Sequence, residues 1–225
     1  LVVTSTPVQR DFELLETVLW RPADGYVLLN LHLDRLCASA GYFDFPCSKV
    51  EATALLAESA KSFGRQACRI RLLLNNEGGF RLECRHIEPA DDQGIVTLRL
   101  AGAPVDTRNP FLYHKTTNRR VYEQALSQAQ HCDDVLLWND AGEITETTIA
   151  NIIVTMAGRR YTPPVSSGLL GGTFRQHLLD SGDVTERVIR LEDLGVADSI
   201  SLVNSVRGEY SAILAEGVVA PRRAG

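Results

Sequence analysis

The stretch Tyr113-His114-Lys115-Thr116-Thr117-Asn118-Arg119 places one lysine where an extended segment gives way to a helix. An apolar run over residues 95–100 and an irregular segment over 103–110 precede it, and a helical pattern follows over 121–130. Such junctions often direct side chains into a cleft. A lysine buried there loses its proton more easily and can act as an amine nucleophile that forms a Schiff base. The alternative is a solvated surface lysine, which is the common case for this residue type.

The residues before this lysine predict a layer of strands and helices. Strands are expected over 12–20, 68–74 and 80–86, and helices over 51–63 and from Asn30 onward. Alternating apolar residues on either side of a Gly-containing turn make the second and third strands a hairpin. The N-terminal half is therefore expected to be an α+β layer.

The residues after the lysine predict more strands, joined by loops and one further helix. Strands are expected over residues 134–138, 151–155, 159–162, 184–189 and 199–203. Pro, Asp and Asn are frequent in the segment before the lysine, which favours a linker there. We therefore predict an α/β (α+β) chain of two domains. Its parts are a small N-terminal domain over 1–104, a linker over 105–112 and a larger C-terminal domain over 113–225.

Composition narrows the classes of function. The chain has 225 residues, 44% of them hydrophobic, and its net charge is −5, which does not favour a nucleic-acid-binding protein. No apolar run is long enough for a membrane span, and no pattern typical of a signal peptide opens the chain. The five cysteines are scattered without a CxxC pair, and the histidines lack metal-ligand spacing. We therefore expect a cytoplasmic protein with reduced thiols and no metal site.

Four features can bind an anion or a cofactor, each with a plainer alternative. Residues 168–172 include adjacent glycines and lead into a helix near Thr173, where free N–H groups can hold a phosphate, or they form an ordinary loop before a helix. Asn204 and Ser205 follow a predicted strand, and could donate further hydrogen bonds or form only a turn. Arg35 on a predicted helix can bind a phosphate, or pair with a surface acid. Glu146 can hold a protonated ring nitrogen, or be an exposed strand acid.

Taken together, five motifs resemble the fold-type IV pyridoxal-phosphate enzymes. This family includes branched-chain aminotransferases, D-amino-acid aminotransferases and aminodeoxychorismate lyases. The motifs occur in the family's order over most of the chain. They are Phe12-Glu13-x-x-Glu16-Thr17, His32-Leu33-Asp34-Arg35-Leu36, Lys115-x-x-Asn118-Arg119, Glu146-x-x-x-x-Asn151-Ile152, and Ser167-Gly168-Leu169-Leu170-Gly171-Gly172 leading to Arg175. The resemblance implies a two-domain fold with pyridoxal 5'-phosphate in the cleft between the domains.

The resemblance also implies roles for individual residues. Lys115 would form the Schiff base with the cofactor and move protons, and Glu146 would keep the pyridine nitrogen protonated. Arg35 would bind the phosphate. The remaining cofactor-binding candidates are Gly172, Thr173, Phe174, Asn204 and Ser205.

The candidate substrate-binding residues are Arg207, Arg119 and Thr17. Arg207 lies two residues beyond Ser205, so its loop can carry it to the substrate side of the cofactor, where a guanidinium suits a carboxylate. The alternative for Arg207 is a surface ion pair with Glu209.

Two stretches resemble the lyase branch of the family, namely residues 115–119 and Asn204-Ser205-Val206-Arg207-Gly208. The resemblance therefore implies a 4-amino-4-deoxychorismate lyase, which eliminates pyruvate and forms 4-aminobenzoate for folate biosynthesis. The first alternative is a class IV aminotransferase acting on D-amino or branched-chain acids. The second is a cofactor-free binding or scaffold domain, which the presence of Lys115, Arg35 and Glu146 disfavours.

The expected partners follow from the same resemblance. The substrate would be a small molecule with carboxylates, and the chain would form a homodimer in which each site is completed by the neighbour's small domain. The chain begins at Leu1 rather than Met, and less sequence than usual precedes the first motif. Both features fit a fusion to, or partnership with, an aminodeoxychorismate synthase.

Overall fold

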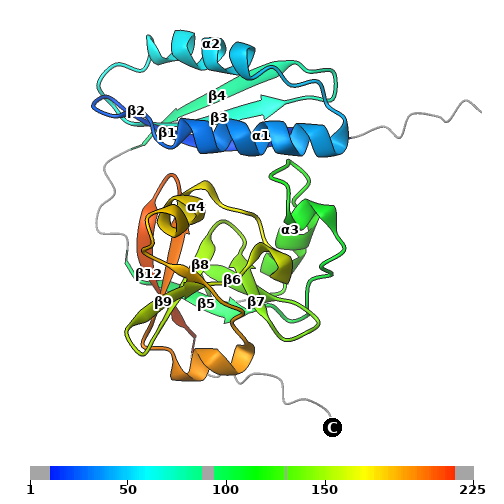
Figure 1. The fold of residues 1–225 in the computed structure, drawn as a ribbon, viewed down its shortest axis with the longest axis vertical. Helices are drawn as coiled ribbons and strands as arrows, with labels where there is room; N and C mark the ends of the chain where they lie inside the picture. Colours follow the sequence, from blue (N-terminus) through cyan, green and yellow to red (C-terminus); the bar gives the residue numbers. More distant parts are fainter. Residues whose placement is uncertain (1–10, 88–93, 130, 216–225) are drawn as a thin grey trace, which may run out of the picture.

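The chain forms two β-sheets, each with helices of its own (Figure 1). The computed structural model describes residues 11–87, 94–129 and 131–215. The four-stranded sheet is built from the first part of the chain, and the eight-stranded sheet from the rest. This confirms the mixed α/β fold with a small N-terminal and a larger C-terminal part.

The smaller sheet has the strand order β2-β1-β3-β4 and is antiparallel throughout. Its strands are β1 (Leu14–Arg21), β2 (Gly25–Tyr26), β3 (Cys68–Leu74) and β4 (Phe80–His86). The helices α1 (Leu29–Phe43) and α2 (Lys49–Ala60) pack on one face, where Leu33 and Leu56 join Ile70 and Leu72 in one apolar core. Because side chains alternate along a strand, the other face carries Thr17, Arg69 and Arg71.

The larger sheet has the strand order β10-β9-β8-β11-β12-β5-β6-β7. Its strands are β5 (Val96–Leu100), β6 (Asp134–Trp138), β7 (Ile144–Thr147), β8 (Asn151–Met156), β9 (Arg159–Thr162), β10 (Thr185–Glu186), β11 (Ser199–Asn204) and β12 (Gly208–Leu214). Since β7 also pairs with β8, six strands close into a ring around buried Leu98, Leu136, Ile152 and Leu202.

Short helices flank this ring. They are α3 (Arg120–Ser127), α4 (Thr173–Asp180) and the 3₁₀ turns η1 (Pro110–Leu112), η2 (Val165–Ser167) and η3 (Leu191–Val196). The pairing that closes the ring joins Glu146 to Asn151, so two candidate site residues meet at the closure.

The lysine segment is tied to the start of β1. Leu15 N donates to Lys115 O at 2.9 Å, and Thr117 N donates to Glu13 O at 2.9 Å. These bonds form an isolated antiparallel bridge between Leu14 and Thr116. Backbone hydrogen bonds therefore fix the lysine segment against the smaller sheet.

The structure divides the chain earlier than the sequence suggested. Strand β5, assigned from sequence to the domain ending at 104, pairs in parallel with β12 and β6 of the larger sheet. The segment 105–112, expected as a linker, is held to the larger sheet by Val105 N, which donates to Trp138 O at 2.8 Å. The chain passes from one sheet to the other between His86 and Val96.

Most other elements match the expectation, with one clear exception. The strand predicted over 184–189 is reduced to the two residues of β10. Val184 and Ile189 are apolar because they pack into two separate clusters, rather than because they alternate along a strand. Within the described part of the chain, no helix is long and apolar enough to cross a membrane, and no set of three acidic, His or Cys side chains could hold a metal ion.

Candidate active site

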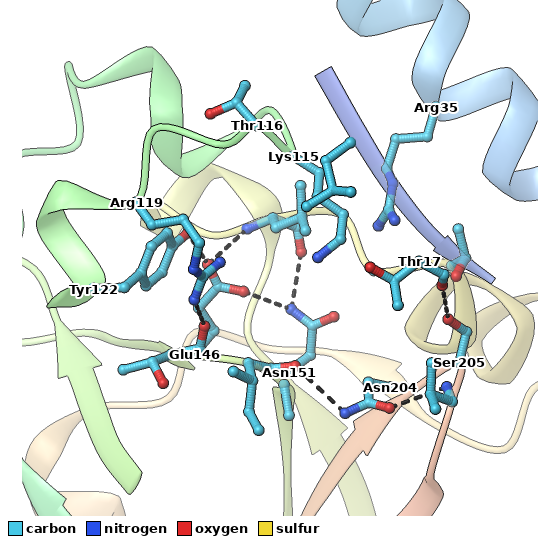
Figure 2. A pocket seen from close by; sticks show the side chains of 18 of the residues that line it. Thr17, Arg35, Lys115, Thr116, Arg119, Tyr122, Glu146, Asn151, Asn204 and Ser205 are labelled. Atoms are coloured by element: carbon cyan, nitrogen blue, oxygen red, sulfur yellow. Dashed lines mark hydrogen bonds between the residues drawn. The ribbon is translucent and has the colours of Figure 1, made fainter. Parts of the chain in front are cut away.

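A pocket of about 400 Å³ is lined by residues of both sheets (Figure 2). The smaller sheet and α1 contribute one part of its wall. The segments around Lys115, Glu146, Thr173 and Ser205 contribute the rest. The predicted site residues that line it are Thr17, Arg35, Lys115, Arg119, Glu146, Gly172, Thr173, Asn204, Ser205 and Arg207.

Phe174 does not line the pocket. Its side chain packs instead against the apolar cluster that contains Leu178 and Val203, so only its backbone remains available for the predicted role.

Lys115 extends its amine into this pocket, in the same space as the guanidinium of Arg35 (Figure 2). Burial and the positive charge of Arg35 lower the pKa of Lys115 from 10.5 to about 8, although Glu16 and Glu146 oppose this. A lysine with such a pKa supplies some neutral amine near neutral pH, which nucleophilic attack and proton transfer both need.

Glu146 lies on β7 and is 4% exposed. Its carboxylate accepts hydrogen bonds from Tyr122 Oη at 2.8 Å, Leu170 N at 3.1 Å and Asn151 Nδ2 at 3.1 Å. Burial raises the pKa of Glu146 to about 7, although the hydrogen bonds from Tyr122 and Leu170 lower it. A cation placed beside this carboxylate would stabilise its ionised form.

Tyr122 and Asn151 are site residues to which the sequence assigned no role. Tyr122 lies on α3 and supports the guanidinium of Arg119, which is 4.7 Å from the ring centroid. Asn151 donates to Leu170 O at 2.9 Å as well as to Glu146. Asn151 belongs to one of the five motifs, and its place opposite Glu146 follows from the pairing of β7 with β8.

The N-terminus of α4 faces the pocket without a side chain capping it. Gly172 is the N-cap, no side-chain hydrogen bond caps it, and Thr173 follows as the first helical residue. A Cβ at Gly172 would lie 1.9 Å from Asn151 Oδ1. Only glycine therefore fits between the helix end and Asn151, and the helix offers its N–H groups to an anion.

Arg35 is held in place by a buried carboxylate. Its Nε and Nη2 donate to Glu16 at 2.8 and 2.6 Å, and its Nη1 donates to Gly171 O at 3.0 Å. Burial alone would raise the pKa of Glu16, but Arg35 and His32 outweigh it and hold that pKa at about 2. The guanidinium therefore stays fixed beside the loop that precedes α4.

Asn204 and Ser205 shape the wall next to the smaller sheet. Ser205 Oγ donates to Thr17 O at 3.2 Å, and this bond joins the two sheets across the pocket. Asn204 Oδ1 accepts from Val206 N at 3.1 Å and from Arg207 N at 2.9 Å. Asn204 thus fixes the turn that carries Arg207, while Ser205 lies on the pocket wall.

The pocket wall is rich in arginine. Arg207 lies over the ring of Tyr210 at 4.3 Å, and Glu209 pairs with Arg160 at 2.5 Å. Arg119 donates to Thr148 O. Arg69, which the sequence did not single out, is exposed on β3 and faces Arg85 across the strand pair. Arg69, Arg119 and Arg207 therefore bring positive charge to the pocket wall, which suits an anionic ligand.

These residues fit the cofactor that the resemblance implies. A buried lysine amine suits the aldehyde of this cofactor, and a buried carboxylate suits its ring nitrogen. The uncapped N-terminus of α4 suits its phosphate. The close fit of Gly172 against Asn151 leaves the backbone at that helix end accessible. The site can therefore hold pyridoxal phosphate and move a proton at Lys115.

The chain is similar to known proteins over most of its length. Residues 13–212 match the family described as "Amino-transferase class IV". A relative in Schizosaccharomyces pombe named "Putative aminodeoxychorismate lyase" is 30% identical over 223 residues, covering 95% of this chain and 93% of its own. A Thermotoga maritima relative named "Probable branched-chain-amino-acid aminotransferase" is 28% identical, covering 88% of this chain and 74% of its own.

Among solved structures, a "Putative amino-acid aminotransferase" from Mesorhizobium loti is 35% identical, with a TM-score of 0.84, over 91% of this chain and 100% of that one. A 4-amino-4-deoxychorismate lyase from Pseudomonas aeruginosa has a TM-score of 0.76 at 19% identity, over 93% of this chain and 85% of that one, and shows the shared fold alone.

Proposed function

Because the chain belongs to the class IV aminotransferase family, whose members use pyridoxal phosphate, we propose that it is a 4-amino-4-deoxychorismate lyase. The reaction splits this substrate into 4-aminobenzoate and pyruvate and consumes no water overall. The observation that carries the proposal is the placement of two of the pocket's arginines, Arg69 from β3 and Arg207 from the turn after β11. A substrate with two carboxylates needs two cationic partners, and guanidinium groups bind carboxylates well.

Similarity to named relatives supports the lyase assignment. The fission-yeast relative matches this chain over almost the whole length of both proteins. The residues after Lys115, namely Thr116, Thr117 and Asn118, resemble the lyase form of the motif.

The chemistry divides between the cofactor and the residues of the chain. When bound, pyridoxal phosphate supplies an electron sink next to the carbon that bears the substrate's amine. Lys115 Nζ would accept the proton from that carbon and return it to the departing enolpyruvyl group. Its pKa of about 8, lowered chiefly by burial, suits both halves of this transfer near neutral pH. Loss of pyruvate makes the remaining ring aromatic, which drives the elimination.

Glu146 keeps the cofactor's ring nitrogen protonated. Tyr122 Oη and Asn151 Nδ2 donate to its two carboxylate oxygens and so fix its orientation. A neutral amide at this position would accept the same bonds poorly and would not balance a positive ring nitrogen.

An aminotransferase is the second candidate. The Mesorhizobium loti structure and the Thermotoga maritima relative are both named as aminotransferases, and both match most of this chain. The same lysine and carboxylate serve amine transfer, which then needs a keto acid as second substrate. A cofactor-free binding domain would have no use for a buried lysine beside a buried carboxylate.

Product analysis separates these candidates. The purified chain, loaded with pyridoxal phosphate, is incubated with 4-amino-4-deoxychorismate, and 4-aminobenzoate and pyruvate are quantified. Equal amounts of both products are expected, with none from Lys115→Ala. Amine transfer from D- or branched-chain amino acids to 2-oxoglutarate, without 4-aminobenzoate formation, would replace the lyase by an aminotransferase. Neither activity in a protein that binds the cofactor would remove both candidates.

The proposal extends to assembly. We expect a homodimer in which the neighbour's smaller part closes each pocket, and an aminodeoxychorismate synthase as fused or associated partner. Sedimentation at micromolar concentration tests the dimer. A fully active monomer would contradict it.

A further inference from the structure

A chain of buried polar groups lies behind the anion-binding end of the pocket. Glu16 on β1, His32 on α1 and Thr173 on α4 are 1%, 1% and 4% exposed. His32 Nδ1 lies 2.6 Å from Glu16 Oε2, and His32 Nε2 lies 3.3 Å from Thr173 Oγ1. One imidazole therefore connects a carboxylate of the smaller sheet with the first residue of the helix that faces the pocket.

The direction of the first hydrogen bond is fixed by the carboxylate. Glu16 is ionised, because its interactions with Arg35 and His32 outweigh the effect of its burial and hold its pKa at about 2. An ionised carboxylate only accepts hydrogen bonds, so His32 Nδ1 carries a hydrogen and donates it. A Glu16 carboxylate held by both His32 and Arg35 also fixes the ring of His32 in one orientation.

The second hydrogen bond has two possible directions. If His32 Nε2 accepts, the hydroxyl hydrogen of Thr173 points at the imidazole, and only oxygen lone pairs face the pocket. If Nε2 donates, the ring carries a hydrogen on both nitrogens and is a cation, and the hydroxyl hydrogen of Thr173 is free to point at a bound anion. A phosphate group accepts hydrogen bonds, repels lone pairs and favours a nearby cation, so it selects the second direction, in which the ring of His32 holds one more proton.

We propose that Glu16 and His32 are positioning residues that orient the Thr173 hydroxyl as a donor to the cofactor's phosphate. The inference rests on the proposed function for the placement of that phosphate at the start of α4. The donor adds to the free N–H groups of the helix and to Arg35, which the same carboxylate holds. Phosphate binding is thereby linked to the packing of β1 and α1 against α4.

The test compares two ligands that differ only in the phosphate. Pyridoxal phosphate and pyridoxal are titrated calorimetrically into Lys115→Ala, which cannot bond covalently to either. His32→Phe and Thr173→Val are then added, singly and together, in this background. Loss of a charge-assisted hydrogen bond is expected to weaken pyridoxal phosphate binding about tenfold or more. Pyridoxal binding should change less than twofold. The double variant should lose no more than either single one.

A matched control is His177→Phe, which makes the same exchange at an exposed position of α4 and should change neither ligand. The proposal would be overturned if His32→Phe weakened the binding of both ligands equally. It would also be overturned if the fold-losses of affinity of the two single variants multiplied in the double variant. If His32→Phe does not fold, Thr173→Val and Thr173→Ser decide. Thr173→Val should lose the preference for pyridoxal phosphate over pyridoxal, and Thr173→Ser should keep it. An unchanged preference in Thr173→Val would refute the role of the Thr173 hydroxyl.

This preference for phosphate does not depend on which reaction the loaded protein performs. A protein that transfers amines rather than releasing pyruvate would still show it. The failure of one proposal is therefore distinguishable from the failure of the other.

Discussion

Gly172 should be replaceable only at a clear loss of stability, because its neighbour leaves no space for a side chain. A Cβ built at this position lies 1.9 Å from Asn151 Oδ1 and 3.1 Å from Asn151 Cγ. The φ angle of Gly172 is −66°, which alanine adopts freely, so backbone strain does not contribute. In Gly172→Ala, the side chain of Asn151 or the start of α4 must move.

The size of the loss follows from the bonds that Asn151 makes. Its Nδ2 donates to Glu146 Oε2 at 3.1 Å and to Leu170 O at 2.9 Å, and a displaced amide keeps neither. One of these bonds goes to a carboxyl group and the other to a backbone carbonyl, and together they contribute about 2–4 kcal/mol. The free energy of unfolding should fall by about this amount, and the melting temperature by roughly 5–15 °C.

Gly171→Ala is the matched control. The nearest atom to a Cβ at Gly171 is Val165 Cγ2 at 3.7 Å, an ordinary contact. This variant should be within about 1 kcal/mol of the parent, since alanine also restricts the unfolded chain. Urea unfolding of both apoproteins, followed by circular dichroism, measures the difference. If Gly172→Ala were as stable as Gly171→Ala, the placement of Asn151 against the start of α4 would be wrong.

Three further substitutions test the charges of the pocket. Burial raises the pKa of Glu146 from 4.5 to about 7, so its contribution to apoprotein stability is full below pH 4.5 and lost as pH rises through 7. Glu146→Gln should remove this pH dependence of the free energy of unfolding, which is on the order of 3 kcal/mol. Urea unfolding at several pH values across that range measures it. Tyr122→Phe removes a donor that lowers the same pKa, so the acidic limb of the pH–rate profile should move to higher pH, and an unmoved limb would contradict this. Arg69→Ala should raise KM about tenfold without changing cofactor affinity, while Arg85→Ala, its strand neighbour outside the pocket, should change neither.

Local sequence patterns were sufficient for the elements whose cause is local. The limits of β3 and β4 follow from alternating side chains on either side of the turn after Leu74, and the structure has the predicted limits. The start of α4 at Thr173 follows from the adjacent glycines before it. These signals lie within a few residues of the features that they determine.

Pairings between distant segments were beyond the reach of such patterns. The place of β5 beside β12 depends on residues more than a hundred positions apart, so its apolar run gave no indication of which sheet it joins. Asn151 meets Glu146 because the ring closes between β7 and β8, and Tyr122 reaches the same carboxylate from α3. The contact of His32 with Thr173 likewise needs α1 and α4 in place.

The most direct test of the account is to identify the lysine that bonds to the cofactor. The chain has three lysines, of which Lys49 and Lys61 are paired on the surface with Asp34 and Glu58. The protein is loaded with pyridoxal phosphate, reduced with borohydride, digested and mapped by mass spectrometry. The added mass is expected on Lys115 alone, and none is expected in Lys115→Ala. Stoichiometric labelling of Lys49 or Lys61, with Lys115 unmodified, would contradict it.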